Sequence, residues 1–250
     1  MVWLTRTLDA LYDATLTLAY PQACAVCDRA SVEARADMPA CASCWGTTQV
    51  FSGEETICWK CGVLAPAPVD EEKKISVRCR RCDDDYFTAA RAVGVYHGAL
   101  RASVLRLKRE PHVGKRVARL LNEAQKRPPL DAATLIIPVP LHRGRERERG
   151  FNQAAVLGRA LATSSKLPLD ELCLVRVANT EPHRAGMDAH ARRESVAGAF
   201  QVPRPRLVEG ERILLIDDVF TTGATASACA RVLRAGGAQE VFVLTVARAV

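Results

Sequence analysis

Short apolar runs and amphipathic stretches alternate along most of the chain. The apolar runs predict β-strands at 90–96, 134–138, 172–177, 212–216 and 240–247. Between them, apolar residues recur at helical spacing and predict helices around 100–109, 113–126, 151–163 and 225–235. Strands that alternate with helices favour a mostly parallel sheet covered on both faces. We therefore predict an α/β domain over residues 87–250.

The first 22 residues show a different pattern, with Leu4, Leu8, Leu11 and Tyr12 on one stripe of an expected amphipathic helix. We expect this helix to pack on the protein's own body, and membrane association is the alternative. The segment lacks the basic start and cleavage site of a secretory leader. The sequence also lacks the roughly 18 consecutive apolar residues of a membrane span. A cytoplasmic protein is expected.

Cysteines dominate the segment 23–86. Eight of the ten cysteines form four C-x-x-C pairs, which are Cys24/Cys27, Cys41/Cys44, Cys58/Cys61 and Cys79/Cys82. A two-residue gap points both thiolates at one metal ion, and two pairs complete the four-sulfur shell that suits zinc. We predict two structural zinc ions, each held by pairs that are consecutive in sequence rather than interleaved. The metal replaces a core that so short a segment can hardly build.

Other uses of these cysteines fit the pattern less well. The expected cytoplasmic location argues against disulfides, and four pairs in one short module argue against a redox motif. Iron–sulfur clusters have the same ligand type and stay an alternative. Four thiolates leave no open coordination position, so the zinc is not expected to be catalytic. Cys173 and Cys229 lie in apolar stretches and are expected to be core thiols.

The net charge of +7 is divided unevenly. Residues 1–86 contain 9 Lys/Arg against 13 Asp/Glu, a net charge of −4. Residues 87–250 contain 26 Lys/Arg against 15 Asp/Glu, a net charge of +11. A basic half attracts phosphate-bearing partners, either a small phosphorylated ligand or a nucleic acid.

The most informative stretch runs from residue 213 to residue 225. A buried strand is followed by an acidic pair, Asp217 and Asp218, and then by a loop that opens a helix. Hydroxyls and accessible N–H groups at a helix amino terminus form a phosphate site, and their sources here are Thr221, Thr222, Gly223 and Thr225. The carboxylates would repel that phosphate, so we place them one ligand length away, where they accept hydrogen bonds from sugar hydroxyls.

Basic residues precede this stretch. Arg145 and Arg149 belong to a run of alternating charge that fits either a solvated turn or contact with a pyrophosphate. Lys108 lies on a predicted helix, where simple surface exposure is the alternative to a ligand contact. The strand at 134–138 ends at a proline-bounded loop, as expected at the carboxyl edge of a parallel sheet, where ligands bind.

These motifs resemble the type I phosphoribosyltransferases, whose loop for 5-phosphoribosyl 1-pyrophosphate (PRPP) has the same form. Nearly the whole chain resembles one branch more closely, the ComF family, also called GntX-like or competence protein F. The cysteine pairs are similar to that family's double zinc ribbon, and Ile137-Pro-Val-Pro-Leu141 resembles its pyrophosphate loop. The stretch of residues 176–200 matches the family pattern at Arg176, Thr180, Arg192 and Phe200, whereas His183 and Ser195 depart from it.

The resemblance implies PRPP binding with Mg²⁺ by Asp217, Asp218, Thr221, Thr222, Gly223 and Thr225. It places Arg145, Arg149 and Lys108 on the pyrophosphate side. It also implies a role in DNA uptake during natural transformation, with single-stranded DNA and the uptake machinery as partners. The alternative is an active phosphoribosyltransferase of unknown acceptor in nucleotide metabolism, without a DNA role. No residue stands out as a general base, so catalytic residues stay unassigned. The expected parts of the chain are an N-terminal amphipathic helix at residues 1–22, a double zinc ribbon at 23–86 and a phosphoribosyltransferase-like domain at 87–250.

Overall fold

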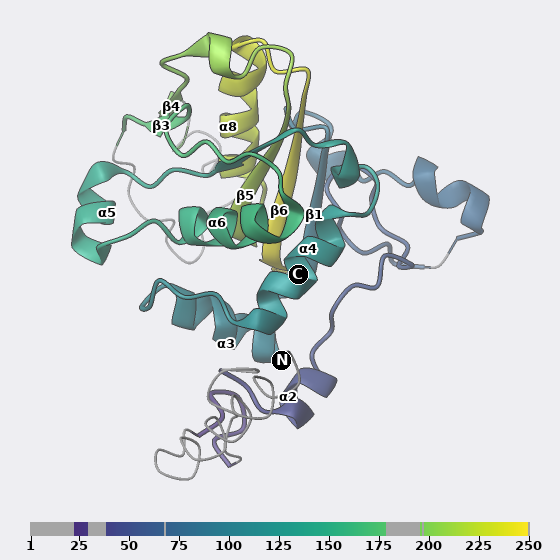
Figure 1. Cartoon of the computed structure of the whole chain (residues 1–250). Coiled ribbons are helices and arrows are strands. Elements are labelled where there is room, and N and C mark those ends of the chain that lie inside the picture. The colour runs from purple at the N-terminus through teal and green to yellow at the C-terminus, as the bar shows by residue number, and fades with distance from the viewer. Residues whose placement is uncertain (1–22, 30–38, 68, 179–195, 197, 250) are drawn as a thin grey trace, which may run out of the picture.

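A computed structural model describes residues 23–29, 39–67, 69–178, 196 and 198–249 (Figure 1). The helix predicted for residues 1–22 lies outside these residues, as do Thr180, His183, Arg192 and Ser195. Within the described residues, no helix combines the length and the hydrophobicity that a transmembrane segment requires.

Four parallel strands form the centre of the molecule (Figure 1). They are β1 (Ala89–Val95), β2 (Leu135–Pro138), β5 (Arg212–Phe220) and β6 (Glu240–Arg248). Their order across the sheet is β1-β6-β5-β2, and Asp217 lies opposite Thr245 in the register. Residues 213–216 and 241–244 are buried, as strands covered on both faces require. The predicted α/β class is confirmed.

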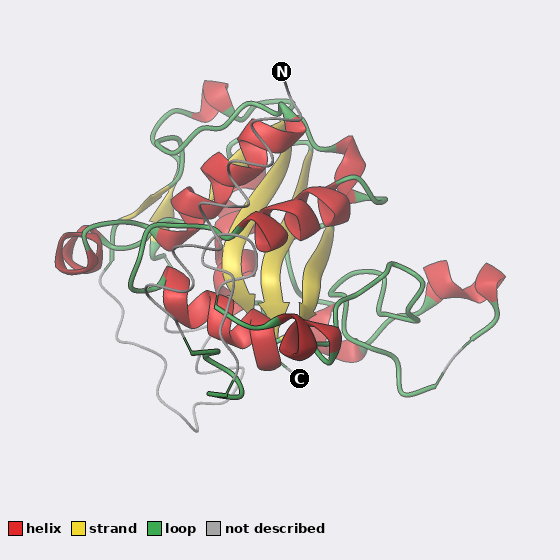
Figure 2. Cartoon of the chain, turned by 60° about the horizontal axis from the view of Figure 1, so that its bottom comes forward, coloured by secondary structure: helices red, strands yellow, loops and turns green. Residues whose placement is uncertain are grey.

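Side chains alternate between the two faces of the sheet, and each face has its own helices (Figure 2). Leu214 and Ile216 belong to the core of one face, formed with α3 (Gly98–Leu107), α4 (Lys115–Gln125) and α6 (Gln153–Ser165). Ile213 and Leu215 belong to the core of the other face, which contains α8 (Ala224–Ala235). Two short 3₁₀ helices, η3 (Leu130–Ala132) and η4 (Pro205–Leu207), connect these elements.

The structure corrects three sequence-based predictions of elements in this region. The strand expected at 172–177 is reduced to β3 (Val175–Arg176), which pairs antiparallel with β4 (Phe200–Gln201) outside the parallel sheet. The reason is Asp170, whose carboxylate accepts hydrogen bonds from the N–H groups of Leu172 and Cys173 and turns the chain away.

The second correction concerns β5, which continues beyond the predicted end at Ile216 because β6 pairs with it as far as Phe220. Asp217 and Asp218 are therefore part of the strand. The third concerns residues 143–149, which precede the helix predicted at 151–163 and form a separate helix, α5 (Arg143–Arg149). His142 accepts a hydrogen bond from the N–H of Gly144 at its start, and Gly150 ends it in the left-handed conformation.

The cysteine-rich segment covers the outer edge of β1. The Ala90 N–H donates to Lys60 O at 2.6 Å, and the Phe51 N–H donates to Val93 O at 2.8 Å. This segment contains α2 (Ala42–Gly46) and the 3₁₀ helices η1 (Glu71–Ser76) and η2 (Arg80–Cys82). Because an exposed strand edge invites pairing with other chains, this cover also protects the sheet.

The cover approaches β1 most closely at Gly94, which bridges to Val50. A Cβ atom on Gly94 would lie 2.2 Å from Gln49 O and 2.6 Å from Leu100 Cδ1. Both atoms belong to packed elements, so a side chain at this position would push residues 49–50 away from the strand.

Gly94→Ala should therefore lower the free energy of unfolding by about 1–3 kcal/mol, the usual cost of overpacking. It should also make residues 49–51 more sensitive to limited proteolysis. Gly46→Ala is the matched control, because no atom lies within 4 Å of the Cβ position there. Urea unfolding of both variants measures this difference. If Gly94→Ala unfolds with the same free energy as the unmodified chain, residues 49–50 accommodate the added methyl group and the prediction is wrong.

Candidate functional site

The carboxyl ends of the four parallel strands meet at one edge of the sheet. The segments that leave this edge are α3 after β1, the α5 region after β2, and residues 221–223 after β5. Open α/β sheets bind their ligands at this edge. It is also where most of the residues singled out in the sequence come together.

Residues 221–225 form a compact loop on the amino terminus of α8. Gly223 caps the helix with a φ of +82°, a conformation that favours glycine. A Cβ atom there would also lie 2.8 Å from Phe220 Cζ, so a side chain would clash. Thr222 Oγ1 accepts a hydrogen bond from the Ala224 N–H at 3.5 Å. The loop surrounds a small cavity of about 40 Å³ that Thr221, Thr225 and Asp217 also line. Free N–H groups and hydroxyls at the start of a twelve-residue helix suit an anion.

The two carboxylates of the acidic pair point to opposite faces, because they are neighbours in a strand. Asp217 lines the loop cavity itself on the α8 face, so it is not one ligand length away from the loop as expected. Asp218 is buried on the α3 face, where its Oδ2 lies 3.2 Å from Lys108 Nζ. The structure thus brings Lys108 to the acidic pair.

Burial raises the pKa of Asp217 well above its ordinary value, and the neighbouring charge of Asp218 raises it further. The Asp218 N–H, which donates to Asp217 Oδ1 at 2.8 Å, and the more distant Lys108 act in the opposite direction. A cation bound at this carboxylate would favour its ionised form.

The arginines of α5 have different environments. Arg149 is exposed, and its Nη1 donates to Gln153 Oε1 at 2.5 Å. Arg145 is half-buried and close enough to Arg176 to contribute, after burial, to the lowered pKa of Arg176. The charge of Asp217 acts on Arg176 in the opposite direction. Arg145, Arg176 and Asp217 therefore belong to one electrostatic environment, although no role was assigned to Arg176 from the sequence.

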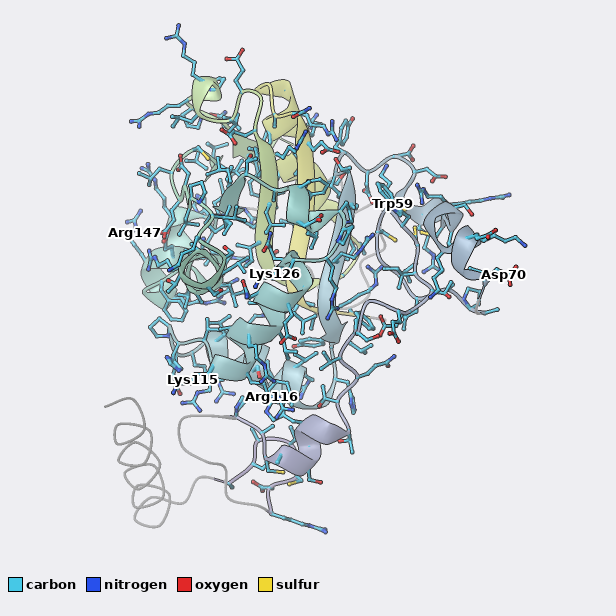
Figure 3. The ribbon with its side chains drawn as sticks, turned by 45° about the vertical axis from the view of Figure 1, so that its right-hand side comes forward. Trp59, Asp70, Lys115, Arg116, Lys126 and Arg147 are labelled. Atoms are coloured by element: carbon cyan, nitrogen blue, oxygen red, sulfur yellow. The ribbon has the colours of Figure 1, made fainter. Side chains whose placement is uncertain are left out.

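The first cysteine cluster lies beside α3. The Sγ atoms of Cys24, Cys27, Cys41 and Cys44 are all within 4.8 Å of one another, and the Cys41 N–H donates to Cys24 Sγ at 3.2 Å. Cys24, Cys41 and Cys44 belong to the core that contains α3 and α4. The Arg116 guanidinium on α4 lies 4.8 Å from the ring centre of Trp45 in α2 (Figure 3).

The second cysteine cluster lies against the opposite face of the sheet. It contains Cys58, Cys61, Cys79 and Cys82, whose Sγ atoms are also within 4.8 Å of one another. Three of these thiols belong to the core that contains α8. The Cys79 N–H donates to Cys58 Sγ at 3.3 Å.

Both clusters fit structural zinc, with the pairs grouped in sequence order as predicted. A tetrahedral ion bonded at about 2.3 Å to four sulfurs requires sulfur–sulfur separations of about 3.8 Å. The separation is 3.9 Å between Cys27 and Cys41, 3.7 Å between Cys58 and Cys82, and 3.5 Å between Cys61 and Cys79. The geometry therefore leaves room for one ion in each cluster.

Backbone N–H groups prepare one thiol of each cluster for ionisation. Burial opposes it, but hydrogen bonds from three neighbouring N–H groups lower the pKa of Cys24 to about 6. The same balance lowers the pKa of Cys58 to about 7. Burial and the neighbouring thiols raise the pKa of Cys44 to about 12. Four thiolates repel one another, and a bound dication removes that penalty.

Arg248 connects the second cluster to the loop of residues 221–225. Its Nη1 donates to Cys61 O, and its Nη2 lies 4.0 Å from Cys61 Sγ. The same guanidinium lies 4.8 Å from the ring centre of Phe220, the residue before the loop. No motif in the sequence pointed to Arg248, because its partner Cys61 is 187 positions away.

Comparison with known families finds a double zinc ribbon domain over residues 15–85. Competence protein F of Haemophilus influenzae is 34% identical over 142 residues, which cover 55% of this chain and 62% of that protein. DNA utilization protein YhgH of Salmonella typhimurium is 30% identical over 223 residues, 84% of this chain and 94% of that protein. Competence protein ComFC of Bacillus subtilis is 34% identical over 47% of this chain and 46% of its own length.

Solved structures give a weaker likeness. Adenine phosphoribosyltransferase from Thermoanaerobacter pseudethanolicus has a TM-score of 0.32 and 19% identity, over 52% of this chain and 64% of that one. Purine phosphoribosyltransferase from Pyrococcus horikoshii has a TM-score of 0.30 and 16% identity, over 54% of this chain and 85% of that one. Because one relative at 30% identity aligns over 94% of its own length and the double zinc ribbon matches independently, the chain belongs to the ComF family.

Proposed function

We propose that the chain binds PRPP, or a related phosphorylated ribose, together with Mg²⁺, and acts in DNA uptake. The observation that carries the first part is the Thr/Gly loop on the amino terminus of α8, next to Asp217 at the carboxyl edge of the sheet. An anion site and a sugar-directed carboxylate side by side match the two ends of a ribose 5-phosphate.

In this proposal the 5-phosphate is held by Thr221, Thr222, Gly223 and Thr225. Asp217 accepts hydrogen bonds from the ribose hydroxyls. Asp218 and Lys108 stand on the other face of the strand, where Asp218 would hold Mg²⁺ and Lys108 would face the pyrophosphate. Mg²⁺ prefers such carboxylate and phosphate oxygens. Arg145 and Arg149 complete the pyrophosphate side, where guanidinium groups suit phosphate oxygens.

Enzymatic phosphoribosyl transfer is the alternative, and the observation that favours it is that the loop, the acidic pair and Lys108 meet at one edge of the sheet. The bond between the anomeric carbon and the pyrophosphate oxygen would break, a nitrogen of the acceptor would bond to that carbon, and the nitrogen would lose a proton. That proton would pass to solvent or to the departing pyrophosphate. Release of pyrophosphate from PRPP in the presence of single nucleobases tests this activity, and its absence leaves a binding function.

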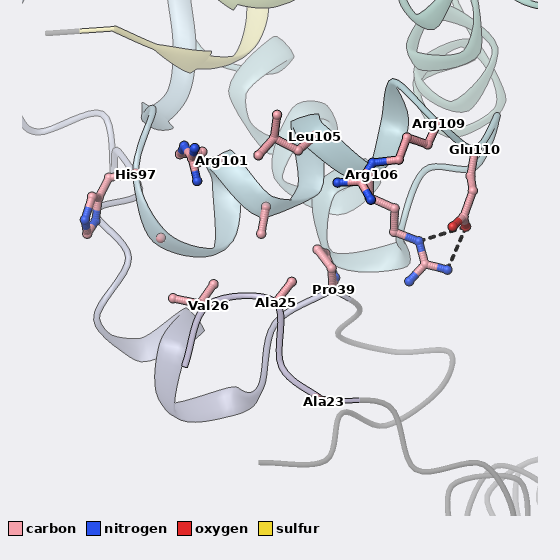
Figure 4. A pocket seen from close by; sticks show the side chains of 12 residues that line it. Ala23, Ala25, Val26, Pro39, His97, Arg101, Leu105, Arg106, Arg109 and Glu110 are labelled. Carbon is pink, nitrogen blue, oxygen red and sulfur yellow. Dashed lines mark hydrogen bonds and ion pairs between the residues drawn. The ribbon is translucent and has the colours of Figure 1, made fainter. Parts of the chain in front are cut away.

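The names of the relatives support the second part of the proposal, since they are called competence and DNA utilization proteins. Cationic side chains also gather along α3. A cavity of about 630 Å³ between α3 and the first cysteine cluster is lined by Arg101, Arg106 and Arg109, and Arg106 pairs with Glu110 at 2.8 Å (Figure 4). Lys115 and Arg119 lie on α4. We propose that a single DNA strand follows these cations. We also propose that the protein is cytoplasmic and that its domains are residues 1–22, 23–86 and 87–250.

The metal content is the first prediction. Protein purified without added metal should contain two zinc ions per chain by mass spectrometry, one for each cysteine cluster. Cys58→Ser should leave one ion, because a three-thiol site binds zinc less tightly, whereas Cys173→Ala should leave both. Chelation should unfold the ribbons and lower the stability of the α/β domain, because both clusters belong to its cores. Iron in place of zinc, or a single ion in the unmodified chain, would contradict the two-zinc assignment.

The second prediction concerns PRPP. Replacing both Asp217 and Asp218 by Asn should abolish binding of PRPP with Mg²⁺ in isothermal titration, without unfolding the domain. Each hydrogen bond to a charged group contributes roughly 1.5–3 kcal/mol, so each carboxylate should account for about tenfold or more in affinity. Thr222→Val should weaken the binding of any 5-phosphorylated sugar. Thr163→Val is its control, since Thr163 is exposed on α6, away from the loop. Unchanged affinity in the double variant would remove the loop from the proposal.

The third prediction concerns DNA. Single-stranded DNA should bind mainly through its phosphates, so the logarithm of the affinity should fall steeply and linearly with the logarithm of the salt concentration. Lys115→Gln with Arg119→Gln should reduce that slope by about 0.7 for each cation lost. Arg231→Gln, on the exposed side of α8, should leave it unchanged. Salt-insensitive binding in fluorescence anisotropy would show that these cations do not hold the strand.

A further inference from the structure

A second large cavity lies between the cysteine-rich segment and the α/β domain. Its volume is about 670 Å³, within the range of small-molecule sites. One wall comes from residues 51–59, and the opposite wall comes from β1 and the end of α4. Figure 3 shows Trp59 between β1 and the lobe that carries Asp70, and Lys126 at the end of α4. The loop of residues 221–225 does not line this cavity.

The cavity exists because the cover of β1 is interrupted. Lys60 pairs with Ala90, and Phe51 pairs with Val93, but the chain leaves the strand edge between these two contacts. Arg91 and Ala92, the strand residues in between, line the cavity. The opening is therefore a feature of the backbone pairing rather than of one side-chain rotamer.

The apolar part of the wall suits a flat ring. It contains Trp59, Phe51, Ile57 and the pair Pro128–Pro129. The Trp59 ring is half-buried, packs against the core and lines the cavity, and the Arg78 guanidinium lies 4.7 Å from the ring centre. Aromatic side chains fixed in this way are the platforms on which nucleic-acid bases stack.

The polar part of the wall suits an anion. Arg91 Nη1 donates to Trp59 O at 2.8 Å and Ala90 O at 2.9 Å, and Arg127 Nη1 donates to Phe51 O at 2.8 Å. Within the part of the chain that the structure describes, each guanidinium group donates these hydrogen bonds through Nη1 only. The Nε and Nη2 donors of both groups are therefore available to a ligand. Burial lowers the pKa of Arg91 to about 10, and it is still cationic at neutral pH.

Two carboxylates, Glu54 and Glu55, line the same cavity as the three cations Arg91, Arg127 and Lys74, so the wall keeps a net charge of +1. Glu55 accepts hydrogen bonds from the N–H groups of Ser52 and Gly53 and from the Ser52 hydroxyl, so its carboxylate is committed to its own turn. Glu54 is exposed. Lys74, whose Nζ donates to Glu54 O at 2.7 Å, adds a third cation to the wall.

We infer that this cavity binds one nucleotide unit of a single-stranded DNA, with the base against Trp59 and the Pro128–Pro129 pair and the phosphate at Arg91 and Arg127. This inference rests on the DNA role proposed above. It adds a site at which the protein would contact a DNA base as well as a phosphate. The remaining phosphates lie outside the cavity, where Lys126 continues the positive charge.

The test compares two oligonucleotides of equal charge in fluorescence anisotropy with the full chain loaded with zinc. One is a 15-residue oligo-dT, and the other has the same backbone with every base removed. Oligo-dT should bind about tenfold more tightly, since stacking of one base contributes roughly 1–3 kcal/mol. Trp59→Ala should abolish that preference, and Trp59→Phe should retain most of it. Arg127→Gln should weaken the binding of both oligonucleotides, and Arg231→Gln should change neither.

The outcomes separate this site from the proposed function. If both oligonucleotides bind equally to the unmodified chain, the DNA role stands and the nucleotide cavity is overturned. If neither binds, both fail. If free dTMP binds as tightly as oligo-dT, the cavity is a site for free nucleotides and the DNA assignment is overturned. Zinc content and circular dichroism of each variant confirm that the fold is intact, and the Trp59→Phe result keeps the test valid if Trp59→Ala unfolds.

Discussion

The architecture depends on the covered edge of β1. An edge strand presents unpaired N–H and C=O groups, and here the cysteine-rich segment satisfies them through Lys60, Phe51 and Gln49. The contact is a backbone contact, so it requires glycine where the chains come closest, at Gly94 and at Gly62. By wrapping this edge, the segment places one cysteine cluster in the core of each face. The two metal sites therefore brace the sheet from both sides.

This arrangement places the second cluster behind the candidate phosphate loop. The loop rests on Phe220, Phe220 packs edge-to-face on Phe87 with ring centres 5.8 Å apart, and Arg248 joins the Phe220 ring to Cys61. A helix amino terminus binds an anion well only when its N–H groups are held in one orientation. The ribbon thus contributes to the candidate site through Arg248, which contacts the Phe220 ring beneath the loop. None of the ribbon's cysteines lines the loop cavity.

The sequence allowed the cysteine clusters, the strand–loop–helix unit around Gly223 and the parallel sheet to be predicted because these follow from local spacing and periodicity. The opposite directions of Asp217 and Asp218 were missed because the predicted strand ended at Ile216; strand alternation would have revealed them. Three contacts had no local signal at all. They are Lys108 with Asp218, Arg248 with Cys61, and Arg234 with Tyr86 O and Thr88, each of which joins segments that only the complete sheet brings together.

The position of β6 has a consequence for how the chain is assembled during synthesis. It lies between β1 and β5 in the sheet but follows both of them in sequence, and its Val241 N–H reaches back 153 positions to Thr88. Until β6 leaves the ribosome, β1 has no strand partner and the ribbons have no Arg248. At that stage only bound metal ions would stabilise the ribbons. The parallel sheet would still lack the β1–β6 and β5–β6 pairings, and pairings between segments far apart in sequence form slowly. The pairing of β6 therefore completes the sheet and provides Arg248, which contacts both the ribbon at Cys61 and the support of the candidate phosphate loop at Phe220.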